Sequence, residues 1–120
     1  MRGERYLVKP KQYTRVYDEG SSWVDSLLVM KAVPNGLVLS RYGISVSKRV
    51  GNAVVRNRVK RLLRETLRVK QIKPGWDIIF IARSMAGRAG YASLEKTTND
   101  LLSRAQLLVS EDDRVCLRND

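Results

Sequence analysis

The chain has 120 residues, of which 23 are Lys or Arg and 12 are Asp or Glu, giving a net charge of +11. Apolar residues make up 43% of it, which is enough for a packed core and excludes a disordered basic tail. A single cysteine, Cys116, excludes an internal disulfide and a multi-cysteine metal site; there is no signal-peptide pattern and no apolar run of about 18 residues. We therefore expect one cytoplasmic domain over residues 1–120, without a membrane segment. Its ordered core should span about residues 7–109, and the tail over 110–120 need not be ordered.

Residues 10–19 are predicted to form a short helix, because its proline is tolerated in the first turn and a glycine follows its last residue. Tyr13 and Tyr17 are four residues apart and therefore share one face of this helix. Two interpretations of that face stay open. The rings either pack against a sheet, or they form a platform on which unpaired bases stack.

Two extended stretches follow the first helix. Residues 22–33 are strand-like and end at a Pro-Asn-Gly turn, and residues 37–47 form a second stretch that holds one strand or two short ones. Along the second stretch, large apolar side chains point to one side of the chain: Tyr42, Ile44 and Val46. The side chains that point the other way are mostly small or polar: Arg41, Gly43, Ser45 and Ser47. That side leaves room for a nucleic-acid backbone to lie against the sheet.

Most of the net charge lies on residues 48–70, which hold nine basic residues and one acid, Glu65, for a net of +8. Residues 53–69 are predicted to be a helix, because a Gly-Asn pair precedes them and apolar residues recur at spacings of 4, 3, 4 and 3: Val55, Val59, Leu62, Thr66 and Val69. The opposite side, within an arc of roughly 100°, carries Asn57, Lys60, Arg61, Arg64 and Arg68.

This basic ladder, about 16 Å long at the helical rise per residue, favours a phosphate backbone as its partner. Arginine predominates in it, and the planar guanidinium suits bidentate phosphate contacts. A solvated basic face is the plain alternative. A membrane-surface helix and a calmodulin-target helix are two others, but both need the apolar stripe free, whereas a domain of this size needs it in the core.

The last third of the chain contains a predicted central strand, residues 76–82, and a final helix capped by Ser93. The apolar stripe expected on that helix is Leu94, Thr98, Leu101, Ala105 and Leu108. The strand, basic helix and second strand make a βαβ unit, which the general rule would make right-handed.

The stretch from Ile44 to Glu65 strongly resembles the signature of the bacterial ribonuclease P protein component. The triplet Arg56-Asn57-Arg58 is its most specific part, and the resemblance extends more weakly over about residues 7–109. It implies an α+β fold: a single-domain α/β sandwich with an about four-stranded mixed sheet packed with helices, in the order αβββαβα. The implied fold is ribosomal protein S5 domain 2-like, with a left-handed βαβ crossover.

The resemblance also implies a function. In that family the catalytic RNA removes the 5′ leader of precursor tRNA with Mg²⁺ held by the RNA subunit and the substrate, and the protein assists. The implied partners are the ribonuclease P RNA and precursor tRNA, and no obligatory protein partner is evident. The residues implied for RNA contact are Lys48, Arg49, Arg56, Asn57, Arg58, Lys60, Arg61, Arg64 and Arg68. Arg56 and Arg58 lie at the edges of the polar arc, where either is also placed to brace the helix.

The leader cleft implied by the resemblance is lined by Tyr13, Tyr17, Lys31, Ser45 and Ser47. Lys31 departs from the family pattern, in which a tyrosine is common at this position. The departure shifts the expected cleft from base stacking toward phosphate contact.

The side chains themselves do not suggest a catalytic centre or a metal site. The chain has no histidine, and its acids are scattered except for Glu111-Asp112-Asp113 in the tail. Asp77 is interpreted as a turn or cap residue. The alternative function is a non-catalytic RNA-binding module, such as a ribosomal or assembly protein. A DNA-binding protein is disfavoured, because no helix-turn-helix spacing accompanies the basic helix.

Overall fold

The computed structural model describes residues 6–109, which are built around one four-stranded sheet. Its strands are β1 (Ser21–Val24), β2 (Leu28–Pro34), β3 (Arg41–Ser45) and β4 (Trp76–Ala82), in the spatial order β1-β2-β4-β3. β2 is antiparallel to both β1 and β4, whereas β3 runs parallel to β4. The predicted mixed sheet of an α+β fold is confirmed.

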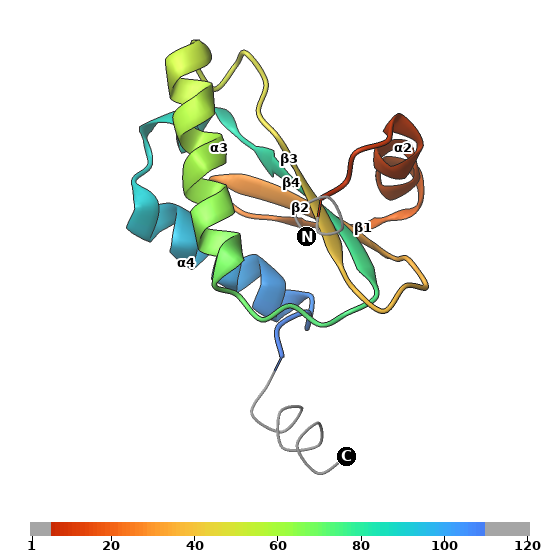
Figure 1. The fold of residues 1–120 in the computed structure, drawn as a ribbon. Helices are drawn as coiled ribbons and strands as arrows, with labels where there is room; N and C mark the ends of the chain where they lie inside the picture. The colour runs from red at the N-terminus through yellow and green to blue at the C-terminus, as the bar shows by residue number, and fades with distance from the viewer. Residues whose placement is uncertain (1–5, 110–120) are drawn as a thin grey trace.

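Helices cover the two faces of the sheet unequally (Figure 1). Helices α3 (Ala53–Arg68) and α4 (Tyr91–Arg104) pack together on one face, and the shorter α2 (Pro10–Glu19) lies on the other. A short 3-10 helix, η1 (Ser84–Arg88), leads from β4 to α4. In Figure 1, β3 passes in front of β4, and α3 joins them on the side away from α2, which makes the crossover left-handed. This is the hand that the resemblance implied and the opposite of the general rule.

The larger core lies between the sheet and the α3–α4 layer. Its fully buried side chains include Leu63 of α3, Phe80 of β4 and Leu101 of α4. A smaller core under α2 consists of Leu7, Val16, Val33 and Ile79. Because each buried aliphatic side chain stabilises the fold by about 1.5–3 kcal/mol, the α3–α4 side supplies most of the hydrophobic stabilisation. The face under α2 is therefore free to stay partly open.

The first predicted strand, residues 22–33, is a hairpin. β1 and β2 are separated by a turn in which the Asp25 carboxylate accepts the N–H of Ser26 at 2.6 Å, while the Asp25 N–H is donated to the Leu28 carbonyl at 2.9 Å. An aspartate that bonds nearby backbone favours a turn, and this local signal overrides the apolar run. The stretch 37–47 holds one strand.

The basic helix is confirmed, with a correction at its end. Asn52 caps it, since the Asn52 Oδ1 accepts the Val55 N–H at 3.0 Å. Val69 was predicted to be buried, but it is the C-cap residue and is 65% exposed. Because α3 packs against both the sheet and α4, its buried arc is wider than the predicted stripe and is formed by Val59, Leu62, Leu63, Thr66 and Leu67.

Helix α4 begins earlier than predicted. Its N-cap residue is Gly90 and not Ser93, which lies within the first turn. Three residues of the predicted stripe are fully buried: Leu94, Thr98 and Leu101. The other two, Ala105 and Leu108, lie beyond the last helical residue, because the chain turns at Gln106, whose φ is 59°.

Candidate nucleic-acid interface

The polar side of α3 has no acidic partner in the described part of the chain. Asn57, Arg61, Arg64 and Arg68 are exposed, and Lys60 is half-buried. None of these five side chains makes a hydrogen bond or an ion pair with any of residues 6–109. Like charges three or four residues apart on a helix repel by a few tenths of a kcal/mol per pair. An anion lying along these five residues, the α3 ladder, would relieve that repulsion.

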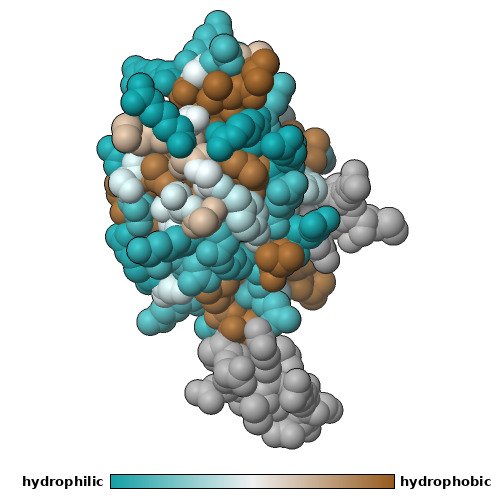
Figure 2. Space-filling model, turned by 90° about the vertical axis from the view of Figure 1, so that its left-hand side faces the viewer, coloured by the Kyte–Doolittle hydropathy of each residue, from teal (hydrophilic) through white to brown (hydrophobic). Residues whose placement is uncertain are grey.

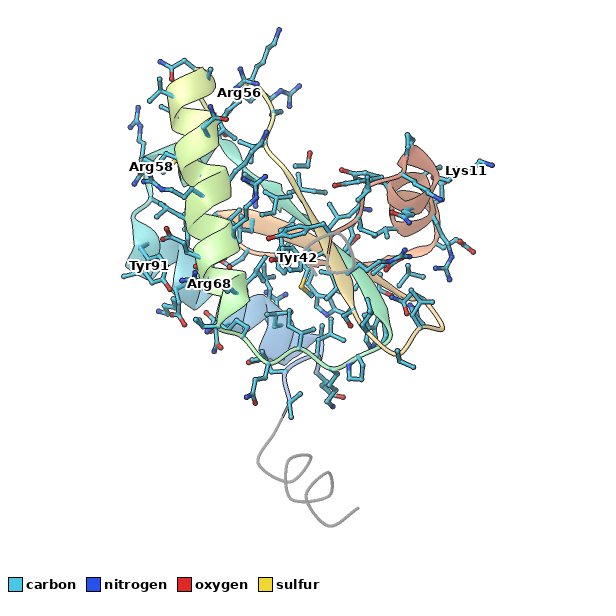
Figure 3. All side chains as sticks on the ribbon, viewed as in Figure 1. Lys11, Tyr42, Arg56, Arg58, Arg68 and Tyr91 are labelled. Carbon is cyan, nitrogen blue, oxygen red and sulfur yellow. The ribbon has the colours of Figure 1, made fainter. Side chains whose placement is uncertain are left out.

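Arg56 and Arg58 leave α3 on opposite sides, at the edges of the ladder (Figure 3). Arg58 donates from Nη2 to the Ala89 carbonyl at 2.7 Å and from Nη1 to the Gly87 carbonyl at 3.5 Å. Its guanidinium therefore braces the end of η1, which confirms the bracing interpretation for this residue. Arg56 is half-buried, and its Nε has no hydrogen-bond partner within the described part of the chain.

The turn before α3 adds two exposed cations. Lys48 and Arg49 lie in a turn closed by a hydrogen bond from the Val50 N–H to the Ser47 carbonyl, at 3.1 Å. Neither side chain has a partner among residues 6–109. The positive surface thus continues from the α3 ladder around the N-terminal end of the helix.

The sheet face under α2 is only partly covered. α2 packs over one end of it, where Val16 contacts the small core that includes Val33 and Ile79. Toward the other end, the strand register places these side chains on the same face: Lys31, Val29, Ile81 and Ser45. All four are half-buried, and we call them the open sheet face.

The two tyrosines of α2 differ in how far their rings are exposed. Tyr13 is half-buried, its hydroxyl donates to the Leu7 carbonyl at 3.1 Å, and its ring lies over Gly43, where an added Cβ would come within 2.5 Å of the hydroxyl oxygen. Tyr17 is 40% exposed. The Tyr13 ring is therefore mostly packed against the sheet, as the first of the two interpretations predicts. The Tyr17 ring is exposed and available to a ligand.

The pKa of Tyr13 also depends on a charge of the basic helix. Burial raises the pKa of its phenol, the neighbouring Tyr17 raises this pKa as well, and the positive charge of Arg64 acts in the opposite direction. α2 and α3 lie on different faces of the sheet, so the Arg64 charge acts on Tyr13 across the edge strand β3. The Arg64 guanidinium and the Tyr13 phenol are therefore near enough for their charges to interact.

We expect the Tyr13 phenol to titrate above the usual value near 10 in an NMR pH titration of tyrosine-labelled protein. Arg64→Gln should raise the pKa of Tyr13 further, since it removes the charge that lowers it, whereas Lys96→Gln on α4 should leave it unchanged. Because the folded pKa lies above the unfolded one, the associated stability is present below pH 10 and is lost as the pH rises through the folded value. An Arg64→Gln variant with an unaltered Tyr13 curve would contradict the proximity.

The structure brings four of the five predicted cleft residues to the α2 side of the sheet: Tyr13, Tyr17, Lys31 and Ser45. Lys31 has no hydrogen bond or ion pair within residues 6–109, so its ammonium group is free for an anion. Ser47 is exposed, but it lies beyond the end of β3 in the turn that leads to α3.

An ion pair under α2 was not predicted from the sequence. Asp77 is nearly fully buried; its Oδ1 accepts the Arg41 Nε at 2.9 Å, and its Oδ2 accepts the Arg41 Nη2 at 2.8 Å. The Asn35 amide also donates to Oδ1, at 2.9 Å. The hydrogen bonding of Arg41 to Asp77 is the main reason that the pKa of Arg41 is raised. Asp77 is therefore a buried anchor between β3 and β4 and not the turn or cap residue predicted.

Among residues 6–109, no three His, Cys, Asp or Glu side chains gather in a way that would hold a metal ion. Within the same range, every helix is too short or too polar to cross a lipid bilayer. The predicted tail carboxylates, residues 111–113, and Cys116 lie outside the described residues. The fold and its charge thus define a class of small α+β proteins that carry a basic helix and a partly open sheet face.

Comparisons with known proteins identify the family. A family model described as Ribonuclease P matches residues 1–106. A ribonuclease P protein component from Dehalococcoides mccartyi is 45% identical over 120 residues, the full length of both chains, and one from Roseiflexus castenholzii is 46% identical over 82% of this chain and 84% of its own. The chain belongs to the ribonuclease P protein family, whose members are accessory subunits of an endoribonuclease.

Comparison with solved structures identifies the same family. The ribonuclease P protein of Staphylococcus aureus superposes with a TM-score of 0.80 at 33% identity, covering 87% of this chain and 97% of its own. The protein of Thermotoga maritima superposes with a TM-score of 0.76 at 30% identity, covering 82% and 96%. The resemblance carried by the Arg56-Asn57-Arg58 region is confirmed.

Proposed function

We propose that this chain binds the catalytic RNA of ribonuclease P through the α3 ladder and the 5′ leader of precursor tRNA through the open sheet face and Tyr17. The catalytic RNA then removes the leader by Mg²⁺-dependent hydrolysis of one phosphodiester bond. The Mg²⁺ ions are held by the RNA subunit and the substrate. This complex acts in the cytoplasm, where its tRNA precursors are made.

The observation that carries the proposal is the unpaired state of the ladder. Five neighbouring polar side chains on one helix, four of them cations, make no ion pair and no hydrogen bond with an acid within residues 6–109. Each phosphate that such a side chain neutralises releases counterions, which favours association of two RNAs that otherwise repel each other. The protein would in this way lower the Mg²⁺ concentration that the RNA needs.

Reconstitution tests this function. The protein is mixed with a bacterial ribonuclease P RNA at low Mg²⁺, and 5′ maturation of a precursor tRNA is followed. The expected result is cleavage at a Mg²⁺ concentration at which the RNA alone is inactive. If cleavage is not restored and leader-dependent binding does not improve, the protein is a generic RNA-binding module instead.

Tyr17→Ala should weaken binding of leader-bearing precursor tRNA to the reconstituted enzyme by about 1–3 kcal/mol, which is the usual contribution of one stacked base. Binding of mature tRNA should not change, because it has no leader. Tyr91→Ala on α4 is a matched control, since Tyr91 is 42% exposed and lies on the other layer (Figure 3). Equal losses for precursor and mature tRNA would remove Tyr17 from the leader site.

A further inference from the structure

A basic pocket lies beside the N-terminal end of α3. It has a volume of about 460 Å³ and is formed by the turn before α3, the first turn of α3 and η1. Pockets that hold a small ligand or a single nucleotide have volumes in this range. Its lining residues are Arg49, Val50, Val55, Ser84, Met85, Gly87 and Arg88.

The charge of this pocket is entirely positive. Arg49 and Arg88 are exposed and have no acidic partner among residues 6–109, and no lining residue is acidic. Arginine guanidinium groups recognise phosphate by paired hydrogen bonds and also stack on flat aromatic groups. Two of them lining one depression favour an anionic, planar ligand over a plain aliphatic one.

The rest of the lining is mainly apolar. Val50 is buried and Val55 is half-buried, whereas Met85 is 59% exposed despite its size. Figure 2 shows apolar atoms gathered at the upper end of this face of the molecule, with hydrophilic atoms beside them. A thioether makes favourable contacts with aromatic rings, so an exposed methionine in a pocket that two arginines also line suits the face of a base. The Ser84 hydroxyl adds one group that donates and accepts hydrogen bonds.

The walls of the pocket are held in place before any ligand arrives. Arg58 ties the Gly87 and Ala89 carbonyls at the end of η1 to α3. Gly87 packs so closely on the turn before α3 that an added Cβ would collide with the Val50 carbonyl oxygen. A preorganised site loses less conformational entropy when it binds.

We propose that this pocket holds one unpaired nucleotide of the catalytic RNA, with its base against Met85 and Val55 and its flanking phosphates on Arg49 and Arg88. The inference rests on the proposed function and adds a contact to it. The pocket lies at the N-terminal end of α3, and its Arg49 belongs to the positive surface that continues from the α3 ladder around this end of the helix. An RNA that follows this surface from the ladder reaches the pocket. Splayed single nucleotides are the elements of folded RNA that proteins read by stacking and hydrogen bonding.

Chemical probing at nucleotide resolution tests the proposal on a bacterial ribonuclease P RNA with the full-length protein. The wild-type protein should protect one or two unpaired nucleotides that lie outside the segment protected by the ladder. Arg88→Ala should lower the affinity for this RNA about tenfold, as loss of one charged hydrogen-bonding group does, and Met85→Ala about two- to tenfold. Both variants should expose the same nucleotides while the other protections persist.

Lys96→Ala, which removes one exposed cation from α4, should leave every protection intact. Thermal unfolding of each variant checks that the fold is unchanged, as expected for exposed side chains. Arg88→Ala and Met85→Ala variants with wild-type affinity and protections would overturn the proposal. So would losses seen only with precursor tRNA, which would make the pocket a substrate site. A wild-type protein that does not bind the RNA at all would overturn the proposed function itself, so the two failures are distinguishable.

Discussion

Replacing both Arg64 and Arg68 by alanine is expected to weaken binding to a ribonuclease P RNA by on the order of 100-fold at physiological salt. Each arginine is exposed on the polar side of α3 and has no partner within residues 6–109. A hydrogen bond to a charged group contributes about 1.5–3 kcal/mol, and both side chains are placed to make one to phosphate. Their removal leaves the core side of α3 untouched, so the loss should appear in affinity and not in stability.

The salt dependence of binding separates direct neutralisation of phosphate from a general effect of charge. The slope of log affinity against log salt concentration should become shallower by about 0.7–0.9 for each RNA phosphate that the double variant no longer neutralises. Lys96→Ala is the matched control, since it removes an exposed cation from α4 and should leave the slope unchanged. A double variant with the wild-type slope would exclude Arg64 and Arg68 from the interface.

The basic helix was predictable because its signals are local. Asn52 caps it, apolar residues recur at helical spacing, and the cations occupy the remaining arc. Arg64 and Arg68 are exposed where that spacing placed them. The error at Val69 arises from tertiary packing, because α4 and the sheet together determine which arc of α3 is buried.

The partners of Arg58 and Asp77 were not predictable in the same way. Arg58 meets carbonyls about thirty residues further along the chain, and Asp77 meets Arg41, 36 residues before it. Neither partner follows from the periodicity around the residue itself. The pocket beside η1 was not predictable for the same reason, since its lining comes from two distant parts of the sequence, the turn before α3 and the segment after β4.

The coverage of the sheet also depends on tertiary structure. Alternation along residues 41–47 correctly separated the core side, with Tyr42, from the polar side, with Ser45. It does not say how far α2 extends over the polar side, which follows from the contact of Val16 with Val33 and Ile79. The left-handed crossover is a property of chain topology, and only the family resemblance implied it.

Replacing Arg41 by methionine is expected to lower the free energy of unfolding by about 3–5 kcal/mol, measured by urea denaturation. The Asp77 side chain is 2% exposed, and among residues 6–109 the variant would leave its carboxylate with only the Asn35 amide as a side-chain donor. The raised pKa of Arg41 lies far above neutrality, and stability linked to a raised pKa is lost only as the pH approaches it. The Arg41 contribution to the loss should therefore be the same from pH 6 to pH 9.

A second ion pair in the same protein provides the control. Arg15 and Glu19 are 3.2 Å apart on α2, with side chains 44% and 61% exposed, and exposed pairs of this kind contribute about 0–1 kcal/mol. Arg15 also donates from Nη2 to the Pro34 carbonyl at 2.7 Å, so the pair is removed from its other member. Glu19→Gln should therefore change stability by no more than that. Converting both members of the buried pair, Arg41→Met with Asp77→Leu, should recover much of the loss, because no unpaired charge then remains buried. Equal effects of Arg41→Met and Glu19→Gln would show that burial of Asp77 does not determine the strength of its ion pair.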